Sequence, residues 1–151
     1  MLERYYHPHH LRLTQTVDTT LTLHGKCLVV DCHSFPSHAL PYGFDSTGKA
    51  RPDICIGIDD FHTPPGLAEE LIKNFEGQGF SVTLTSPFAG ALVPMKHYRK
   101  NQNVQSLMIE VNRALYCDEK TGLKGDNFSE VSQLIREALG KACAHATLSL
   151  G

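Results

Sequence analysis

The sequence has no long hydrophobic run and no paired cysteine motif. It contains no stretch of about 18 apolar residues and no basic segment followed by an apolar one at its start, so it predicts neither a membrane span nor a secretory signal. Its five cysteines are odd in number and include no Cys-x-x-Cys pair, which argues against a disulfide framework and a zinc ribbon. We therefore expect a cytoplasmic protein with reduced thiols.

A strong charge of either sign is also absent. The chain has 14 Lys and Arg against 16 Asp and Glu, a formal net charge of -2, and no basic stripe is interleaved with aromatic residues. These features argue against nucleic acid or a membrane as the main partner. A small anionic ligand remains compatible with them.

The chain lacks internal repeats, low-complexity tracts and linker-like runs of Gly and Ser. Its 151 residues are close to the usual size of one domain. Pro and Gly occur as single breaks between periodic segments. We therefore predict a single domain over residues 1–151.

Periodic apolar segments predict strands that alternate with helices. Strands are predicted over residues 27–30, 54–58, 80–84 and 107–111. Helices are predicted before Gly25, from residue 63 to a stop at Gly77 or Gly79, and from Asn127 through Ala142. The alternation predicts an α/β fold with a mixed, mainly parallel sheet flanked by helices.

Polar residues directly follow the first predicted strand. Asp31 and His33 are two positions apart, so in an extended chain they share one face, and Asp31 can orient the imidazole ring. Ligands of open α/β sheets collect at the carboxyl ends of strands. The pair suits a metal ligand or a base, although a loop histidine satisfied by hydrogen bonds is the commoner interpretation of so short a motif.

Glu110 stands inside an apolar strand segment, where a carboxylate is costly to bury without a partner. Desolvation would raise its pKa toward the working range of a general base. A structural salt bridge, with Arg113 three residues away, or a half-exposed edge strand explains the residue equally well.

Three further segments contain groups that often occur in sites. Residues 51–53 and 87–91 are plausible pocket walls, although ordinary turns have the same composition. The histidines at positions 7, 9 and 10 are interpreted as the polar start of the first helix rather than as a metal site.

Several motifs together resemble the N-formylglutamate amidohydrolase family, and the match runs over most of the chain. The two strongest are Asp-Cys-His-Ser at residues 31–34 and Glu-x-Asn-Arg-x-Leu-Tyr at residues 110–116; the others lie at residues 5–10, 53–57 and 87–90. The resemblance implies a core like that of zinc carboxypeptidases and the hydrolysis of N-formyl-L-glutamate to formate and L-glutamate.

The same resemblance implies roles for particular residues. His33 would be a zinc ligand with Asp31 behind it, and Glu110 the general base that takes a proton from metal-bound water. Arg113 would hold a substrate carboxylate through its planar fork, with Asn112 and Arg51 as further substrate-binding residues. The expected partner is a small anionic substrate such as an N-acyl amino acid.

This chain departs from the family pattern at its N-terminus. Relatives carry there a strand-end histidine and a following acidic residue that complete the metal site, and nothing in the first 26 residues resembles them. We therefore expect an N-terminally truncated core that binds zinc weakly or not at all. One hypothesis is an active hydrolase that recruits His62, His97 or Asp59 as substitute ligands. The other is a non-catalytic relative that binds a small acid or a partner protein.

Two geometric predictions follow. His33 and Glu110 should face one pocket at the carboxyl ends of neighbouring strands. Arg113 can reach the same ligand as Glu110 only if the chain bends near Asn112; otherwise it pairs with a buried acid such as Asp118.

Overall fold

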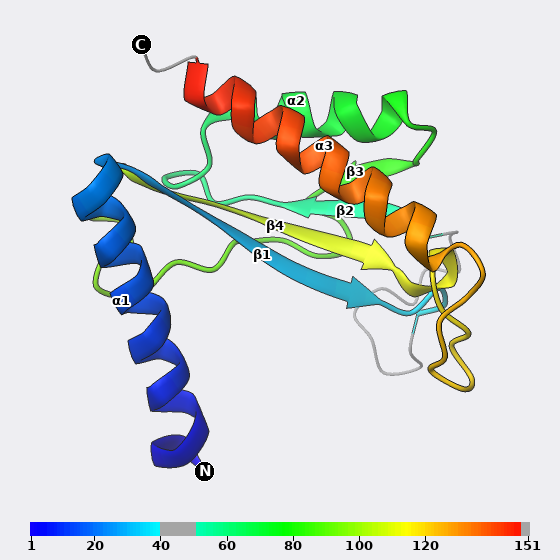
Figure 1. Ribbon diagram of the computed structural model, residues 1–151, viewed down its shortest axis with the longest axis horizontal. Helices are drawn as coiled ribbons and strands as arrows, with labels where there is room; N and C mark the ends of the chain where they lie inside the picture. Colours follow the sequence, from blue (N-terminus) through cyan, green and yellow to red (C-terminus); the bar gives the residue numbers. More distant parts are fainter. Residues whose placement is uncertain (40–50, 149–151) are drawn as a thin grey trace.

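A four-stranded mixed sheet forms the centre of the protein in a computed structural model, which describes residues 1–39 and 51–148 (Figure 1). The order is β1 (Cys27–Phe35), β4 (Val104–Asn112), β2 (Ile54–Gly57) and β3 (Val82–Leu84). β1 is parallel to β4 and β2 is parallel to β3, whereas β2 and β4 are antiparallel. The predicted α/β fold with a mixed, mainly parallel sheet is confirmed.

Two helices, α2 (Pro65–Gly77) and α3 (Phe128–Leu148), cover one face of this sheet (Figure 1). Alternate residues of β2 and β4, among them Ile56 and Ile109, meet Leu71 and Phe75 of α2 and Ala138 of α3 in the main core. Both helices therefore pack as their sequence pattern predicts, because apolar residues at helical spacing give each helix one apolar stripe that faces the sheet.

Helix α1 (His7–His24) packs at the opposite face and reaches away from the sheet (Figure 1). A short π-helix, Leu2–Tyr6, precedes it, and Gly25 ends it in a left-handed conformation with φ 72°. Val17 is its buried residue and joins a second core cluster with Val93 and Val104. Within the described residues, no helix has the length and apolar character needed to cross a bilayer.

Both long strands extend further than their apolar runs predict. β1 continues past Val30 to Phe35, and β4 already begins at Val104. The two pair residue for residue over nine positions, so backbone hydrogen bonds continue the strand where the side chains have become polar. This extension brings Asp31 and His33 into the sheet rather than into a loop.

The irregular chain after β3 closely approaches the sheet face opposite α2 and α3. A side chain at Gly57 of β2 would collide with the carbonyl oxygen of Gly90 and lie 2.5 Å from Cε of Met108. Phe88 from the same irregular segment packs on Phe35 of β1, with ring centroids 5.4 Å apart. Glycine at position 57 thus permits this segment to pack closely against that face.

Candidate functional site

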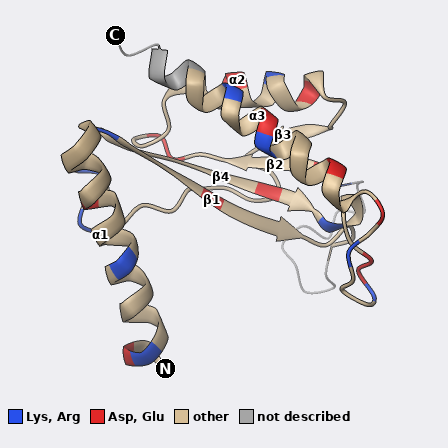
Figure 2. Cartoon of the chain, viewed as in Figure 1, with Lys and Arg blue, Asp and Glu red and all other residues tan. Residues whose placement is uncertain are grey.

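The candidate site lies on the sheet face opposite α2 and α3, near the carboxyl ends of β1 and β4. His33 and Glu110 are partners in the parallel register, so they are side by side on neighbouring strands, as the sequence predicts. Ile109 and Val111 point into the core beneath α3, and strand alternation therefore turns Glu110 to the other face. Figure 2 shows β1 and β4 each carrying a single acidic position and no basic one.

Asp31 holds the imidazole of His33. Oδ1 of Asp31 is 3.0 Å from Nε2 of His33, and the histidine side chain is 49% exposed. Among residues 1–39 and 51–148, Nδ1 of His33 takes part in no hydrogen bond. The contact therefore holds the ring through one nitrogen and leaves the other available to bind a ligand.

Glu110 is the buried carboxylate of the site. It is 8% exposed, and in the part of the chain that the structure describes its carboxylate takes part in no hydrogen bond or ion pair. Burial raises its pKa; the charge of Asp31 adds to that rise, whereas His33 and Arg113 oppose it. A carboxyl group whose pKa is raised exchanges protons more readily near neutral pH, as a general base must.

Arg113 reaches the site because the chain bends directly after β4. The strand ends at Asn112, and a short 3-10 helix, Arg113–Leu115, follows. The guanidinium of Arg113 donates from Nε to Oγ of Ser34 and from Nη2 to the carbonyl oxygen of Ser34, both at 3.1 Å. The bend that the sequence requires for a shared ligand is therefore present.

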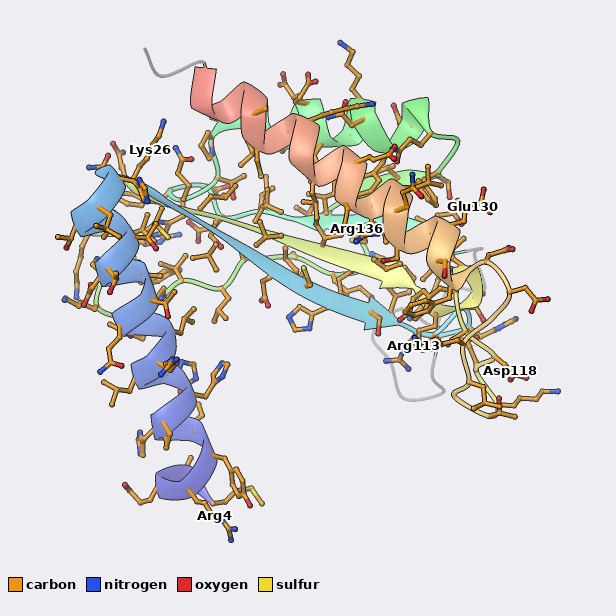
Figure 3. The ribbon with its side chains drawn as sticks, in the orientation of Figure 1. Arg4, Lys26, Arg113, Asp118, Glu130 and Arg136 are labelled. Atoms are coloured by element: carbon orange, nitrogen blue, oxygen red, sulfur yellow. The ribbon has the colours of Figure 1, made fainter. Side chains whose placement is uncertain are left out.

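Among the residues that the structure describes, Asp118 makes no ion pair with Arg113, so the alternative pairing with Asp118 is absent. Its Oδ1 accepts hydrogen bonds from the backbone N–H groups of Lys120 and Thr121, which lower its pKa. Figure 3 shows Arg113 beside the end of β1 and Asp118 on the loop beyond it. Arg113 is thus tied to β1 through two neutral oxygens.

Asn112 and Arg51 both use their polar groups within the chain. Asn112 is buried; its Oδ1 accepts from the N–H of Ala114, and its Nδ2 donates to the carbonyl of Pro52. Nη1 of Arg51 donates to the carbonyl of Pro36 at 2.8 Å. The Arg51 guanidinium lies 5.6 and 5.7 Å from the ring centroids of Phe35 and Phe88.

These contacts make Arg51 part of a cationic, aromatic wall at the end of β1. Asn112 is held by its two internal hydrogen bonds. The predicted substrate-binding residues therefore surround the strand ends, each braced by backbone atoms.

The three proposed substitute ligands lie away from this site, and that part of the active-hydrolase hypothesis is wrong. His62 is 1% exposed; its Nδ1 contacts the carbonyl of Val104, and its Nε2 accepts from the N–H of Arg99. Val104 begins β4, six residues before Glu110, which is about 20 Å along a strand.

His97 and Asp59 are also occupied elsewhere. His97 is held by Asp18 of α1, and Asp59 accepts hydrogen bonds from backbone N–H groups of its own turn.

Two contacts at the site were not predicted. Cys55 of β2 lies opposite Glu110 in the antiparallel register, and its Sγ donates to the carbonyls of Ser86 and Phe88. Both carboxylate oxygens of Glu119 accept from Ser37, which lowers the pKa of Glu119. Strand alternation predicts which residues of β2 share a face with Cys55. It does not predict that Glu110 lies on the same face, which depends on the pairing of β2 with β4.

A pocket of about 360 Å³ lies on the other face, between the ends of β1 and β4 and helix α3. His33 is one of its lining residues, whereas Glu110 is not; its walls are mainly apolar and include Cys32, Ile109, Tyr116, Phe128 and Leu139. This pocket therefore does not fulfil the prediction that His33 and Glu110 face one pocket, because it contains His33 without Glu110.

The chain has clear similarity to one family. The family profile described as N-formylglutamate amidohydrolase matches residues 1–117. The chain is similar to an N-formylglutamate amidohydrolase structure from Ralstonia eutropha JMP134, with 25% identity, a TM-score of 0.76, and 93% of this chain and 51% of that chain covered. It is similar in fold to a gene product from Agrobacterium tumefaciens, with 19% identity, a TM-score of 0.67, and coverages of 97% and 53%.

The chain thus spans about half the length of these two solved structures. No curated protein matches the sequence.

Proposed function

Because the chain belongs to the N-formylglutamate amidohydrolase family, we propose that its site hydrolyses the amide bond of a small N-acyl amino acid, N-formyl-L-glutamate first among them. One observation carries the proposal: a buried carboxylate with a raised pKa, Glu110, stands beside an imidazole, His33, that a second carboxylate orients. Paired acid and base groups of this kind support proton transfer.

In this proposal Glu110 is the general base. It takes a proton from a water molecule whose oxygen attacks the formyl carbon, and it passes that proton to the amine nitrogen as the carbon–nitrogen bond breaks. One water is consumed, and formate and L-glutamate leave. The raised pKa of Glu110 favours both halves of this transfer.

Arg113 is proposed to bind a carboxylate of the substrate. Its fork is already oriented by Ser34 at the end of β1, and a planar guanidinium pairs with a carboxylate through two parallel hydrogen bonds. Arg51, which is held over two aromatic rings, supplies a second cationic group near the same strand end. A substrate with two carboxylates matches this arrangement.

The residues that the structure describes do not provide a complete ligand set for zinc, the metal that the family resemblance implies. Catalytic zinc usually has three protein ligands. Only Asp31 and His33 meet here, and within residues 1–39 and 51–148 no group of three His, Cys, Asp or Glu side chains is placed to hold a metal ion. The steps above therefore use no metal, and we expect slow hydrolysis and weak zinc binding by a single copy.

The test measures formate released from N-formyl-L-glutamate. Glu110→Gln should abolish release, because the amide cannot accept the proton, whereas Glu130→Gln, which changes an exposed acid of α3, should leave the rate unchanged. Equal rates in the wild type and Glu110→Gln would contradict the proposal.

The incomplete ligand set favours a second candidate, a non-catalytic protein that binds a small acid. Calorimetric binding of N-formyl-L-glutamate by the wild type without any formate release would select this candidate. Formate release that depends on Glu110 would reject it.

A further inference from the structure

The chain that follows β3 is fixed on the site face of the sheet. Thr85 turns it there in a left-handed conformation with φ 58°, which a β-branched residue rarely adopts. The backbone N–H of Thr85 donates to a carbonyl oxygen of β2 at 2.8 Å. Sγ of Cys55 then donates to the carbonyl oxygens of Ser86 and Phe88, at 3.2 and 3.3 Å. A strained conformation of this kind persists only where the surrounding structure determines it.

Phe88 reaches from β2 to β1, so its side chain passes over β4. Its carbonyl oxygen is held by Cys55 of β2, whereas its ring packs on the ring of Phe35 of β1, with centroids 5.4 Å apart. β4 lies between these two strands. The register places Cys55 opposite Glu110, and it places Phe35 opposite Asn112. The ring of Phe88 therefore crosses β4 between Glu110 and Asn112.

Glu110, Phe88 and Arg51 follow one another along the direction of the parallel strands β1 and β4. Glu110 is two residues before the partner of Phe35 in β4, which is about 7 Å along a strand. Arg51 lies beyond Phe35, because its Nη1 donates to the carbonyl oxygen of Pro36. Its guanidinium is 5.7 Å from the centroid of the Phe88 ring. An aromatic surface thus separates the proposed general base from a cationic group.

We propose that Phe88 determines which amino acid the site accepts, by binding the methylene groups between the scissile amide and a distal carboxylate. A ligand whose amide lies at Glu110 and whose carboxylate lies at Arg51 must pass over this ring. The side chain of glutamate is such an apolar linker that ends in a carboxylate, whereas that of aspartate is one methylene shorter. The inference rests on the substrate class of the proposed function but does not require hydrolysis.

The ring of Phe88 is held firmly enough to select ligands by length. Phe35 and Cys55, which hold it from two strands, are fully buried and cannot contact a ligand, whereas Phe88 is half-buried. The carbonyl of Gly90, two residues later, lies so close to Gly57 that no side chain fits between them. Against an apolar surface of this kind, one methylene changes specificity by about 10–200-fold.

Calorimetric titrations with N-formyl-L-glutamate and N-formyl-L-aspartate test the proposal. All proteins in this test carry Glu110→Gln, so that hydrolysis does not interfere, and the quantity compared is the ratio of the two dissociation constants. With Phe88 present, the glutamate derivative should bind at least about tenfold more tightly. Phe88→Ala should bring the ratio close to one, because the methylene groups lose their contact.

Phe128→Ala is the matched control for this ratio. It removes a half-buried phenylalanine from α3 on the other face of the sheet and should leave the ratio unchanged. Equal ratios with and without Phe88, or no binding of either ligand while Phe88 is present, would overturn the inference.

The hydrogen bonds of Cys55 provide a second test that leaves the ring in place. Cys55→Ser keeps a donor at this position and should keep the preference for the glutamate derivative. Cys55→Ala removes the donor, so the preference should fall toward that of Phe88→Ala. Two affinities measured on one protein give a ratio that does not depend on the folded fraction. An unchanged ratio in Cys55→Ala would overturn the positioning role of Cys55 alone.

Formate release by the wild type separates this inference from the proposed hydrolase function. A preference that depends on Phe88, together with no formate release, would support the inference and reject the hydrolase. Formate release that depends on Glu110, together with no effect of Phe88→Ala on the ratio, would support the hydrolase and overturn the inference.

Discussion

Glu110 shows how one residue sets the chemistry of the site. It occupies a strand position whose neighbours in sequence are apolar, and the cost of burying its charge is only partly offset by His33 and Arg113. A residue kept at such a cost in stability is a candidate for function rather than for structure.

The stability of the protein should reveal this cost. Burial raises the pKa of Glu110 above its unfolded value, so the destabilisation appears as pH rises through the unfolded pKa and is complete above the folded one. Glu110→Gln should therefore raise the thermal midpoint at pH 7 and lose that advantage in acid, where both side chains are neutral. Melting curves across this pH range measure the effect.

Glu130→Gln serves as the control in the same melts, because Glu130 is exposed and its removal should give no such pH dependence. A Glu110→Gln midpoint at or below that of the wild type at neutral pH would contradict a desolvated carboxylate.

Arg113 is predicted to contribute affinity through the shape of its charged group. Arg113→Lys should weaken the binding of N-formyl-L-glutamate by roughly 1 kcal/mol, about fivefold, because a point charge replaces a two-pronged donor. Calorimetric titration measures this change, and a thermal melt shows that the fold persists. Arg136→Lys on α3 is the matched control and should bind like the wild type; unchanged affinity in Arg113→Lys would remove Arg113 from the site.

Single residues of the site were predictable only where local geometry decides their position. The spacing of Asp31 and His33 is enough to place both on one face of a strand, and their 3.0 Å contact follows from it. The residues that surround Glu110 could not be predicted in this way, because they come from other strands whose pairing with β4 places them there. Cys55 lies opposite Glu110 through a register that no local pattern contains.

At the scale of elements, the apolar pattern locates strands and helices but not their ends. It stops the first strand at Val30 because Asp31 begins a polar segment, whereas pairing with β4 continues the strand to Phe35. The helix after residue 63 was predicted well, since Pro65 begins it and the chain turns at Gly79 with φ 91°. Ends set by local residues are therefore predictable, and ends set by a partner strand are not.

Strand β2 should tolerate no side chain at its last residue. Gly57→Ala would place a methyl group against the carbonyl of Gly90 and the side chain of Met108, and overpacking of this kind costs about 1–3 kcal/mol. Chemical denaturation measures the loss. Gly66→Ala in α2, where no atom lies within 4 Å of the added group, should leave stability unchanged or raise it by up to about 1 kcal/mol; equal stabilities of the two variants would contradict the close approach.

At the scale of the whole molecule, composition and alternation are enough to predict the fold class, but not the order of the strands. The sequence pattern of a single strand does not predict that β2 runs antiparallel to β4 while β1 runs parallel to β4. That arrangement depends on the connections and on which faces α2 and α3 cover. Strand order is a property of the complete chain.

Residues 1–151 are predicted to unfold as one unit. α1 projects from the body, yet Val17 joins the second core cluster, and Asp18 bonds to Lys96 and His97 at 2.7 and 2.8 Å. Urea unfolding followed by far-UV circular dichroism and by tyrosine fluorescence, the chain having no tryptophan, should give coincident transitions. Two separated transitions would contradict a single domain.

The central position of β4 in the sheet also determines when the sheet can form during synthesis on the ribosome. Among the described residues β1 pairs only with β4, and β2 pairs with β4 and the short β3, so this sheet cannot close before Asn112 has emerged. At about 5–20 residues per second, the apolar start of β1 waits unpaired for roughly 4–15 seconds after Phe35 is made. Newly made chains therefore expose a strand that chaperones can bind during this interval.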